Sequence, residues 1–188
     1  MSPASTNAVF SGSCTALVTP FKNGEIDKDA FCKLVDWQIE NGTAALIPVG
    51  TTGESPTLSH EEHDLVVEQC IKQAAGRVPV IAGAGSNSTA EAVRLAKHGA
   101  AAGAGAVLIV SPYYNKPTQE GLYQHFSAVA KAVSVSVIVY DIPGRSIVTV
   151  DDATMARLAA DHANIRGIKD ATADVGRPTR LRNLLGAD

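Results

Sequence analysis

The side chain best placed for chemistry in this sequence is Lys169, which ends the run Asn164–Lys169. The run is typical of a short apolar strand, and a lysine at the end of a buried strand costs free energy unless it is paired or used. Burial favours the neutral amine, and a neutral amine attacks ketones to form a Schiff base. Taken alone, Lys169 is better explained as a lysine that reaches solvent where its strand ends. The rest of the chain favours the catalytic interpretation.

Three other groups of polar residues follow apolar runs. Arg145 comes shortly after Tyr140, where a guanidinium suits a substrate carboxylate, although a lone arginine there is more often part of a surface ion pair. The loop Gly50–Glu54 has glycines that let backbone N–H groups approach a ligand, and a tight turn explains them equally well. Tyr113 and Tyr114 belong either to a site or to an aromatic interface.

A histidine pair, His60 and His63, lies beside two glutamates at a predicted helix start. Histidines three residues apart can chelate a metal, but the spacing differs from that of the HExxH zinc motif. Polar residues on an exposed first turn explain the pair better. We therefore expect no metal and no cofactor.

Short apolar runs recur along the chain, and their starts are 28–33 residues apart. Each is too short for a typical buried helix, and none alternates polar with apolar residues. Such runs predict parallel strands that are covered on both faces. The predicted strands are Cys14–Thr19, Ala45–Val49, Val78–Ala82, Ala106–Val110, Val135–Tyr140 and Ile165–Lys169.

Helical signals fill the segments between these runs. A serine or threonine followed three residues later by an acidic residue predicts a helix start with a capping box, and a glycine past the last apolar turn predicts a helix end. The predicted starts are Ser59 with Glu62, Ser88 with Glu91 and, more weakly, Thr149 with Asp152; the predicted ends are Gly42, Gly76 and Gly103.

Strand–helix units repeated about every 30 residues indicate a parallel α/β sheet, either an open doubly wound sheet or a (β/α)₈ TIM barrel. A dinucleotide-binding open sheet requires GxGxxG after the first strand. The nearest match, Gly83–Ser88, lacks the third glycine and follows the third run. The sequence therefore favours the barrel, whose active sites form just after the strands. Polar residues at those positions are Thr19, Thr51, Thr52, Glu54, Tyr113, Tyr114, Tyr140, Arg145 and Lys169.

The number of units is smaller than a complete barrel needs. Residues 1–188 contain about six β/α units, whereas a (β/α)₈ barrel has eight and typically about 250 residues. We therefore expect a single, incomplete barrel domain, either because about a third of the natural protein is missing or because a shortened form exists. An open barrel leaves two sheet edges unpaired, so we expect this chain alone to aggregate or to be molten and inactive.

Composition limits the classes of function. A hydrophobic content of 45% is enough for a sizeable core, and the net charge of -3 provides no broad basic surface for nucleic acid. The stretch Gly99–Val110 is too short to span a membrane, and Met1–Phe10 lacks the basic and apolar segments of a secretory signal. An odd number of cysteines without CxxC spacing predicts buried, reduced thiols and a cytoplasmic location. The cysteines are Cys14, Cys32 and Cys70.

Five segments together closely resemble the dihydrodipicolinate synthase family, and the resemblance runs from about Gly12 to the end of the chain. Each segment lies at a predicted strand end. The resemblance implies a (β/α)₈ barrel that forms a Schiff base with pyruvate in lysine biosynthesis. The segments are Leu17–Phe21, Gly50–Ser55, Ser111–Pro117, Tyr140–Arg145 and Gly167–Thr172.

The resemblance also implies roles for individual residues. Lys169 is implied to be the Schiff-base lysine, and Tyr140 the phenol that relays protons during imine formation and aldol addition. Thr51 and Tyr114 complete the relay, with Tyr114 reaching a neighbouring subunit of a homotetramer built as a dimer of dimers. Thr52 and nearby backbone groups, such as Gly50, hold the pyruvate carboxylate. Arg145 binds the carboxylate of aspartate semialdehyde.

Many members of this family are inhibited by lysine at a dimer interface, and the residues implied to hold it are present. Glu91 is implied to pair with the α-amino group of lysine, and Asn87 and Tyr113 to bind its carboxylate. His63 is implied to face its side-chain amine. Asp141 departs from the asparagine that many relatives carry after the tyrosine, which changes the local electrostatics. The implied effector residues are Ser55, His60, His63, Asn87, Glu91 and Tyr113.

Two alternatives to the synthase remain open. One is a sister aldolase, such as N-acetylneuraminate lyase or a keto-sugar-acid aldolase; Arg145 argues against the sialic-acid lyases, which generally lack an arginine there. The other is a non-catalytic fragment. In the leading interpretation the partners are pyruvate, aspartate semialdehyde and further copies of the chain, without nucleic acid or membrane.

Overall fold

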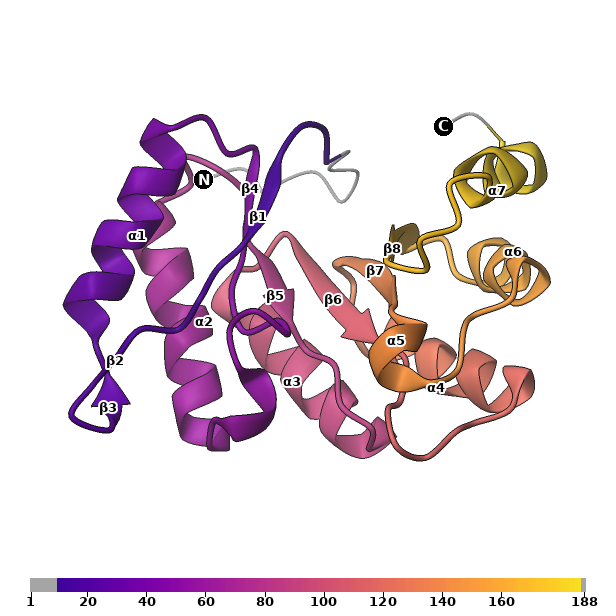
Figure 1. The fold of residues 1–188 in the computed structure, drawn as a ribbon, viewed down its shortest axis with the longest axis horizontal. Helices are drawn as coiled ribbons and strands as arrows, with labels where there is room; N and C mark the ends of the chain where they lie inside the picture. The colour runs from indigo at the N-terminus through magenta and orange to yellow at the C-terminus, as the bar shows by residue number, and fades with distance from the viewer. Residues whose placement is uncertain (1–9, 187–188) are drawn as a thin grey trace.

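In the computed structural model, which describes residues 10–186, parallel strands are ringed by helices (Figure 1). The segment considered for a secretory signal lies outside the described residues, except for Phe10. The strands are β1 (Cys14–Ala16), β2 (Phe21–Lys22), β3 (Glu25–Ile26), β4 (Ala45–Ile47), β5 (Ile81–Gly83), β6 (Ala106–Val110), β7 (Ser136–Asp141) and β8 (Ile165–Asp170). The helices are α1 (Lys28–Glu40), α2 (His60–Ala74), α3 (Thr89–Ala102), α4 (Gln119–Ala132), α5 (Pro143–Ser146), α6 (Asp152–Asp161) and α7 (Arg177–Leu185), with a 3₁₀ turn, η1 (Ser55–Thr57).

The order of the parallel strands in space follows their order in the sequence. β1 pairs with β4, β5–β8 form a four-stranded sheet, and a single bridge between Leu46 and Val80 joins the two groups. A doubly wound sheet reverses its strand order at a switch point, and this arrangement has no such reversal among the described residues. The predicted partial barrel is therefore confirmed. Within residues 10–186, β1 and β8 are the two open edges.

Four of the six predicted strands begin at the predicted residue and a fifth begins one residue later. The exception is β5, which starts at Ile81 instead of Val78. Pro79 has no N–H to donate to a ladder, so the chain makes only the bridge at Val80 before regular pairing begins. The expected coverage on both faces is wrong for β1, where no residue is fully buried, and for β8, where only Ile165 is. Both are edge strands among the described residues.

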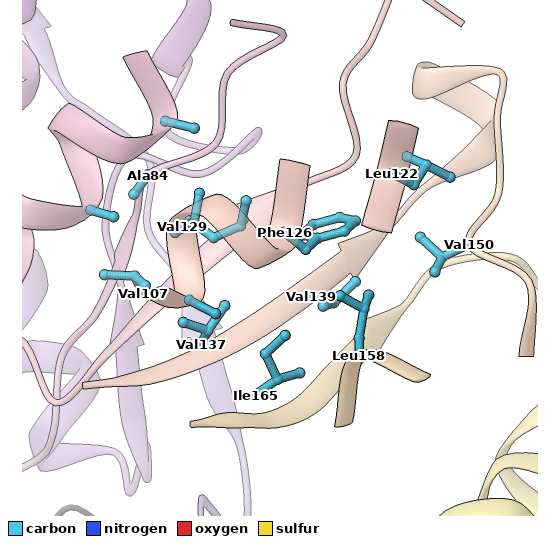
Figure 2. Packing of buried hydrophobic residues seen from close by; sticks show 14 of the residues in the cluster. Ala84, Val107, Leu122, Phe126, Val129, Val137, Val139, Val150, Leu158 and Ile165 are labelled. Atoms are coloured by element: carbon cyan, nitrogen blue, oxygen red, sulfur yellow. The ribbon is translucent and has the colours of Figure 1, made fainter. Parts of the chain in front are cut away.

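Side chains alternate between two faces of the sheet, and each face has its own core. On the outer face, Val107, Val137 and Val139 pack against Phe126 of α4 and Leu158 of α6 (Figure 2). A second outer cluster joins β1, β4 and β5 to α1 and α2. The inner face, toward the barrel axis, carries Ala45, Ile47, Ile81, Ala106, Leu108 and Tyr140.

The helix starts and ends follow the predicted signals with one exception. Ser59 and Glu62 form the complete capping box of α2, and Ser88 caps α3 by accepting a hydrogen bond from the Glu91 N–H. The third start is wrong, because Asp151 precedes α6 and the Thr149 hydroxyl donates to Asp141 instead. Each predicted end has a glycine at positive φ: Gly42, Gly76 and Gly103.

Two composition-based expectations can be compared with the structure. Only Cys70 is buried, whereas Cys14 and Cys32 are half-buried, so the predicted burial of all three thiols is wrong. Burial raises the pKa of the Cys70 thiol to about 12, with a smaller contribution from Cys32. In the part of the chain that the structure describes, no helix is long and apolar enough to cross a membrane.

Candidate active site

Lys169 and Tyr140 are direct neighbours on the inner face of the sheet. They are register partners on β8 and β7, so both side chains leave their strands on the same side. The Lys169 Nζ lies 4.1 Å from the centroid of the Tyr140 ring. Tyr140 is 6% exposed, whereas Lys169 is half-buried at the open edge, so the expected burial of this lysine is only partial. The pair places an amine and a phenol side by side.

A cavity of about 260 Å³ lies at the carboxyl ends of the strands, next to Tyr140. Loops after β4, β6 and β7 bring their polar residues to its wall, as expected for a barrel active site. Predicted site residues that line it are Gly50, Thr51, Ser55, Tyr113, Tyr140 and Arg145.

Lys169 belongs to a second, larger cavity of about 660 Å³ on the inner face, lined mainly by apolar side chains of the strands and of α7. Leu108 lines both cavities. Since Tyr140 lines the smaller cavity and its ring contacts the Lys169 amine, Tyr140 stands between the two spaces. A molecule in the smaller cavity therefore reaches the amine past the phenol.

Two residues with expected roles in catalysis or pyruvate binding line neither cavity. Thr52 is exposed on the loop after β4. Tyr114 is 86% exposed and has a positive φ of 70°, so its ring extends away from the chain. Within the described residues, Tyr140 shares the smaller cavity with Thr51 and contacts Lys169, which lines the larger one. Tyr114 lines neither cavity.

The loop after β4 is fixed by close backbone contacts. A Cβ atom at Gly83 would lie 2.3 Å from the Val49 carbonyl oxygen, and one at Gly53 would lie 3.0 Å from the Val49 backbone. The buried Thr19 hydroxyl donates to the Gly53 carbonyl at 2.7 Å. Glycine is required here for close approach, and the result is a fixed position for Gly50 and Thr51.

Arg145 lies on the short helix α5, at the rim of the smaller cavity. Its side chain makes no ion pair with the described residues, so the guanidinium is available to an anion. The turn is held by Ser146, whose hydroxyl is 3.0 Å from the Ile142 carbonyl and 2.9 Å from that of Val148. A cation at the mouth of a cavity is suited to bind a substrate carboxylate.

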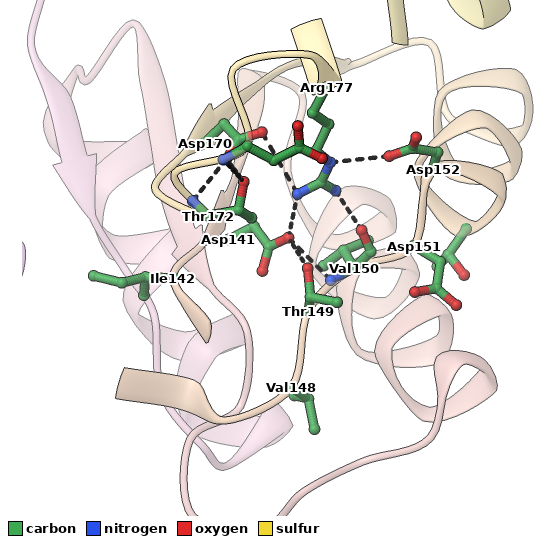
Figure 3. A network of polar contacts seen from close by, with 12 residues as sticks. Asp141, Ile142, Val148, Thr149, Val150, Asp151, Asp152, Asp170, Thr172 and Arg177 are labelled. Atoms are coloured by element: carbon green, nitrogen blue, oxygen red, sulfur yellow. Dashed lines mark hydrogen bonds and ion pairs between the residues drawn. The ribbon is translucent and has the colours of Figure 1, made fainter. Parts of the chain in front are cut away.

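Behind Lys169 and Tyr140 lies a buried ion network that sequence reasoning missed (Figure 3). Arg177, at the start of α7, donates to the Asp141 carboxylate at 2.6 Å and to Asp152 at 2.9 Å. The same Asp141 oxygen accepts hydrogen bonds from the Thr149 hydroxyl and the Val150 N–H. The departure from asparagine at position 141 marks one member of the network, but its partner is 36 residues away in sequence.

The residues expected to bind lysine fall into separate groups. His60 Nε2 contacts one oxygen of the Glu91 carboxylate, and the Ser86 hydroxyl contacts the other. These contacts, Ser86 first, lower the pKa of Glu91. Asn87 pairs with Asn115 at 3.4 Å. The remaining expected members, Ser55 and Tyr113, line the smaller cavity, and His63 lies below the surface.

The expectation that His63 lies on an exposed first turn is wrong. It is 4% exposed, and its Nδ1 is 3.7 Å from Asp64, beyond hydrogen-bond distance. Burial is the main cause that lowers its pKa. Among the described residues, no cluster of three histidine, cysteine or acidic side chains has the arrangement of a metal site.

Known proteins share both the sequence and the geometry of this chain. The sequence model described as "Dihydrodipicolinate synthetase family" matches residues 9–188. This chain belongs to that family. Its relatives among solved structures are synthases of the same name, so the partial barrel is the family's barrel in part.

Three relatives of the dihydrodipicolinate synthetase family illustrate the match. The 4-hydroxy-tetrahydrodipicolinate synthase of Rhodopseudomonas palustris (strain BisA53) is 63% identical over 179 residues, which cover 95% of this chain and 60% of the relative. The synthase of Acinetobacter baumannii, solved in complex with pyruvate, has a TM-score of 0.91 and 51% identity, covering 94% of this chain and 61% of that one. The synthase of Cyanidioschyzon merolae with lysine bound has a TM-score of 0.90 and 41% identity, covering 93% and 60%.

This member of the dihydrodipicolinate synthetase family is short relative to those proteins. The chain spans about 60% of the length of the relatives that it matches. The matched part contains the amine, the phenol, the glycine loop and the arginine described above.

Proposed function

We propose that the protein condenses pyruvate with L-aspartate 4-semialdehyde to 4-hydroxy-tetrahydrodipicolinate, a lyase reaction of lysine biosynthesis. The observation that carries the proposal is the contact between the Lys169 amine and the Tyr140 ring, beside a cavity with Arg145 at its rim. The relatives named as synthases support the same reaction.

Lys169 and Tyr140 supply the first half of the chemistry. The neutral Lys169 amine attacks the ketone carbon of pyruvate, a C–N bond forms, and the carbinolamine loses water to give an imine. Tyr140 passes the required protons between nitrogen and oxygen, because its phenol is the acid–base group next to the amine. Loss of a methyl proton then gives the enamine, with the iminium as electron sink.

The enamine carbon next attacks the aldehyde of aspartate semialdehyde, and a C–C bond forms. Arg145 binds the carboxylate of this second substrate, and Thr51 relays a proton to Tyr140 from the wall of the same cavity. The amino group that came from aspartate semialdehyde then attacks the imine carbon, which closes the ring. The bond between that carbon and the Lys169 Nζ breaks, and Lys169 leaves as the free amine. In this scheme, Gly50 and Thr52 hold the pyruvate carboxylate through backbone and hydroxyl groups.

Tyr114 has a role only if copies of the chain assemble. Tyr114 is 86% exposed, so its own chain does not bury the ring. We infer that it inserts into the site of a neighbouring subunit, and that the protein is a cytoplasmic homo-oligomer, a tetramer arranged as a dimer of dimers. Sedimentation of the intact protein tests this directly, because a monomer at working concentration would leave Tyr114 without a site.

The test of the mechanism is reductive trapping in the intact protein, with any sequence that follows residue 188. Pyruvate and borohydride should give a stable adduct on Lys169, located by peptide mass spectrometry. Lys116, in the exposed tyrosine loop, is the competing lysine and gives a matched control. Lys169→Ala should abolish the adduct and Lys116→Ala should preserve it. An adduct on Lys116, or no adduct in the wild type, contradicts the proposal.

Arg145→Ala separates the two substrates in the same assay. Imine trapping with pyruvate should persist, whereas kcat/KM for aspartate semialdehyde should fall by about one to two decades, since a hydrogen bond to a charged group contributes roughly 1.5–3 kcal/mol. Efficient turnover of sugar acids in place of aspartate semialdehyde would instead identify a sister aldolase. Loss of imine trapping would mean that Arg145 acts on pyruvate.

We also propose L-lysine as an inhibitor that binds near His60, Glu91, Asn87, Ser55 and Tyr113. The support is that Ser55 and Tyr113 line the smaller cavity together with Tyr140, so an effector there bears on the proton relay. On binding, the Glu91 carboxylate would lose its contact with His60 and pair with the α-amino group of lysine. His63, beneath them, would act by supporting the helix start. A titration with L-lysine that leaves wild-type turnover unchanged at millimolar concentration excludes the proposal.

A further inference from the structure

Arg177 connects the two strands that carry the catalytic pair. Its guanidinium lies 2.6 Å from an Asp141 oxygen and 3.5 Å from an Asp170 oxygen, and it also contacts the Val150 carbonyl. The Arg177 side chain is 4% exposed and that of Asp141 is fully buried. One buried cation therefore bridges the carboxyl ends of β7 and β8 (Figure 3).

The bridged aspartates are the immediate neighbours of the reactive residues. Asp141 follows Tyr140, and Asp170 follows Lys169. Because successive side chains of a strand point to opposite faces, the aspartates extend to the outer face while the phenol and amine extend to the inner face. A shift of either aspartate is thus transmitted through a single peptide unit to the phenol or the amine.

Backbone pairing also joins β7 and β8. Their register is irregular between Val137 and Ile138 and regular from Ile138 through Asp141. Past the strand end, one further bond joins the Ala171 N–H to the Asp141 carbonyl at 2.9 Å. The Arg177 bridge adds a second tie at this point, on the opposite side of the strands from the chemistry.

We infer that Arg177 is a positioning residue for the proposed Schiff-base reaction: by bridging Asp141 and Asp170 it sets the Tyr140 phenol against the Lys169 amine. This inference rests on the proposed function. A buried ion network is a poor source of net stability, because desolvation offsets the attraction, and a fixed arrangement of the bonded groups is its better-attested use.

Arg180 is a matched control three residues along the same helix. It also binds Asp152, at 2.9 Å, and Asp174, at 2.8 Å, but its side chain is 51% exposed and reaches neither strand end. Arg177→Met and Arg180→Met therefore both remove a guanidinium and a contact to Asp152. Only the first removes the bridge between the strands.

The experiment is borohydride trapping with pyruvate in the intact protein, following both the rate constant and the final extent of adduct per molecule. Arg177→Met should lower the rate constant about tenfold or more, since a displacement of ~1 Å in a reacting group can cost on the order of 100-fold. The pyruvate concentration for half-maximal rate should stay unchanged, because Arg177 lines neither of the two cavities. Arg180→Met should react like the wild type.

Arg177→Lys keeps the charge but loses the planar guanidinium. Its trapping rate constant should therefore lie between those of the wild type and Arg177→Met. Added guanidinium ion should partly restore the rate of Arg177→Ala and leave that of Arg180→Ala unchanged.

The outcomes separate the inference from the proposed function. A merely structural role would reduce the final extent of adduct at an unchanged rate constant, and that result overturns the inference while the function stands. An Arg177→Met protein with the wild-type rate constant overturns it as well. A wild type that forms no adduct on Lys169 removes the proposed function and the role of Arg177 with it.

Discussion

The loop after β4 and the ends of β7 and β8 contribute to one candidate site, yet different contacts hold them. In the first region, which we call the glycine half (Val49–Gly53, Gly83 and Gly85), a Cβ atom at Gly53, Gly83 or Gly85 would collide with neighbouring backbone. In the second, the charge half (Asp141, Asp170 and Arg177), a buried cation joins two carboxylates. The glycine half presents Thr51, and the charge half presents Tyr140 and Lys169.

The difference follows from what each half has to position. Gly50 and Thr51 act through a loop whose path is set by backbone contacts, so the loop needs close packing and no charge. Tyr140 and Lys169 come from two strands, and Arg177 adds a side-chain tie to the backbone bond that joins the strand ends. We therefore expect the glycine half to be intolerant of added volume and the charge half to be intolerant of lost hydrogen-bonding groups.

The largest effect should come from Gly83→Ala in the glycine half. Its Cβ would lie 2.3 Å from the Val49 carbonyl oxygen and 2.7 Å from the carbonyl carbon, and backbone atoms cannot move aside as a side chain does. We expect a loss of more than about 4 kcal/mol in the free energy of unfolding, which is enough to prevent folding. Urea unfolding followed by circular dichroism measures it.

Gly144→Ala is the control for this change. Gly144 lies on α5 beside Arg145, where an added Cβ atom would meet no heavy atom within 4 Å and the backbone has no positive φ. Its replacement should change stability by less than about 1 kcal/mol, and in either direction. Equal effects of the two substitutions would mean that close backbone approach does not hold the glycine half.

Much of this fold is predictable because local signals and tertiary structure agree. The run Ala106–Val110 is a strand as predicted, and the capping box of Ser59 and Glu62 forms as written in the sequence. Asn23-Gly24, a strong hairpin signal that the strand pattern misses, joins β2 to β3 with both residues at positive φ. The apolar run around Pro79 predicts a start of β5 that is three residues too early, because hydrophobicity alone does not register the missing N–H of a proline.

The site is predictable only in part, for a reason that lies in distance along the chain. Positions just after parallel strands converge in any such sheet, so the pattern alone indicates Thr51, Tyr140 and Arg145. No local pattern links Arg177 to Asp141, because the contact forms across the outer face between a helix start and a strand end. Similarly, no local pattern places Tyr114 outside the cavities of its own chain, and only the family resemblance implied it.

A smaller but still clear effect is expected from Asp141→Leu in the charge half. The change removes the acceptor of Arg177, Thr149 and Val150 and leaves buried donors without it. Removing one partner of a buried ion pair typically costs about 3–5 kcal/mol, and since Arg177 keeps Asp152 we expect about 3 kcal/mol. Unfolding by urea checks the value.

Asp141→Asn is the matched variant, because an amide oxygen can accept from the same three donors. Its cost should be about 1 kcal/mol, that of weakening a charge-assisted hydrogen bond to a neutral one. If the leucine and asparagine variants were equally stable, the hydrogen bonds to Asp141 would not hold the charge half, and the contrast with the glycine half would fail.

At about pH 5 the effect of acid should be smaller than that of Asp141→Leu, and it acts through buried histidines that lie outside both halves. His125 on α4 is buried beside Phe126, and its Nδ1 lies 2.9 Å from the hydroxyl of Thr89 at the start of α3. Burial lowers the pKa of His125 to about 4, from an ordinary value of 6.5. Because the unfolded chain binds the proton more readily, stability falls as the pH drops from 6.5 toward 4. The full difference is roughly 3 kcal/mol, and about half to two thirds of it is lost by about pH 5.

His125→Gln should remove this pH dependence, so that the free energies of unfolding of variant and wild type converge as the pH falls to about 4. His63→Gln is the comparison in the helix that follows the glycine half, since burial also lowers the pKa of His63. A hydrogen bond from Arg180 is the main cause that lowers the pKa of Asp152, which contacts the charge half. Amide hydrogen exchange between pH 6.5 and 4 should therefore accelerate first in α3 and α4, which His125 joins. Earlier acceleration around β4 and β5 would assign the acid sensitivity to His63 instead of His125.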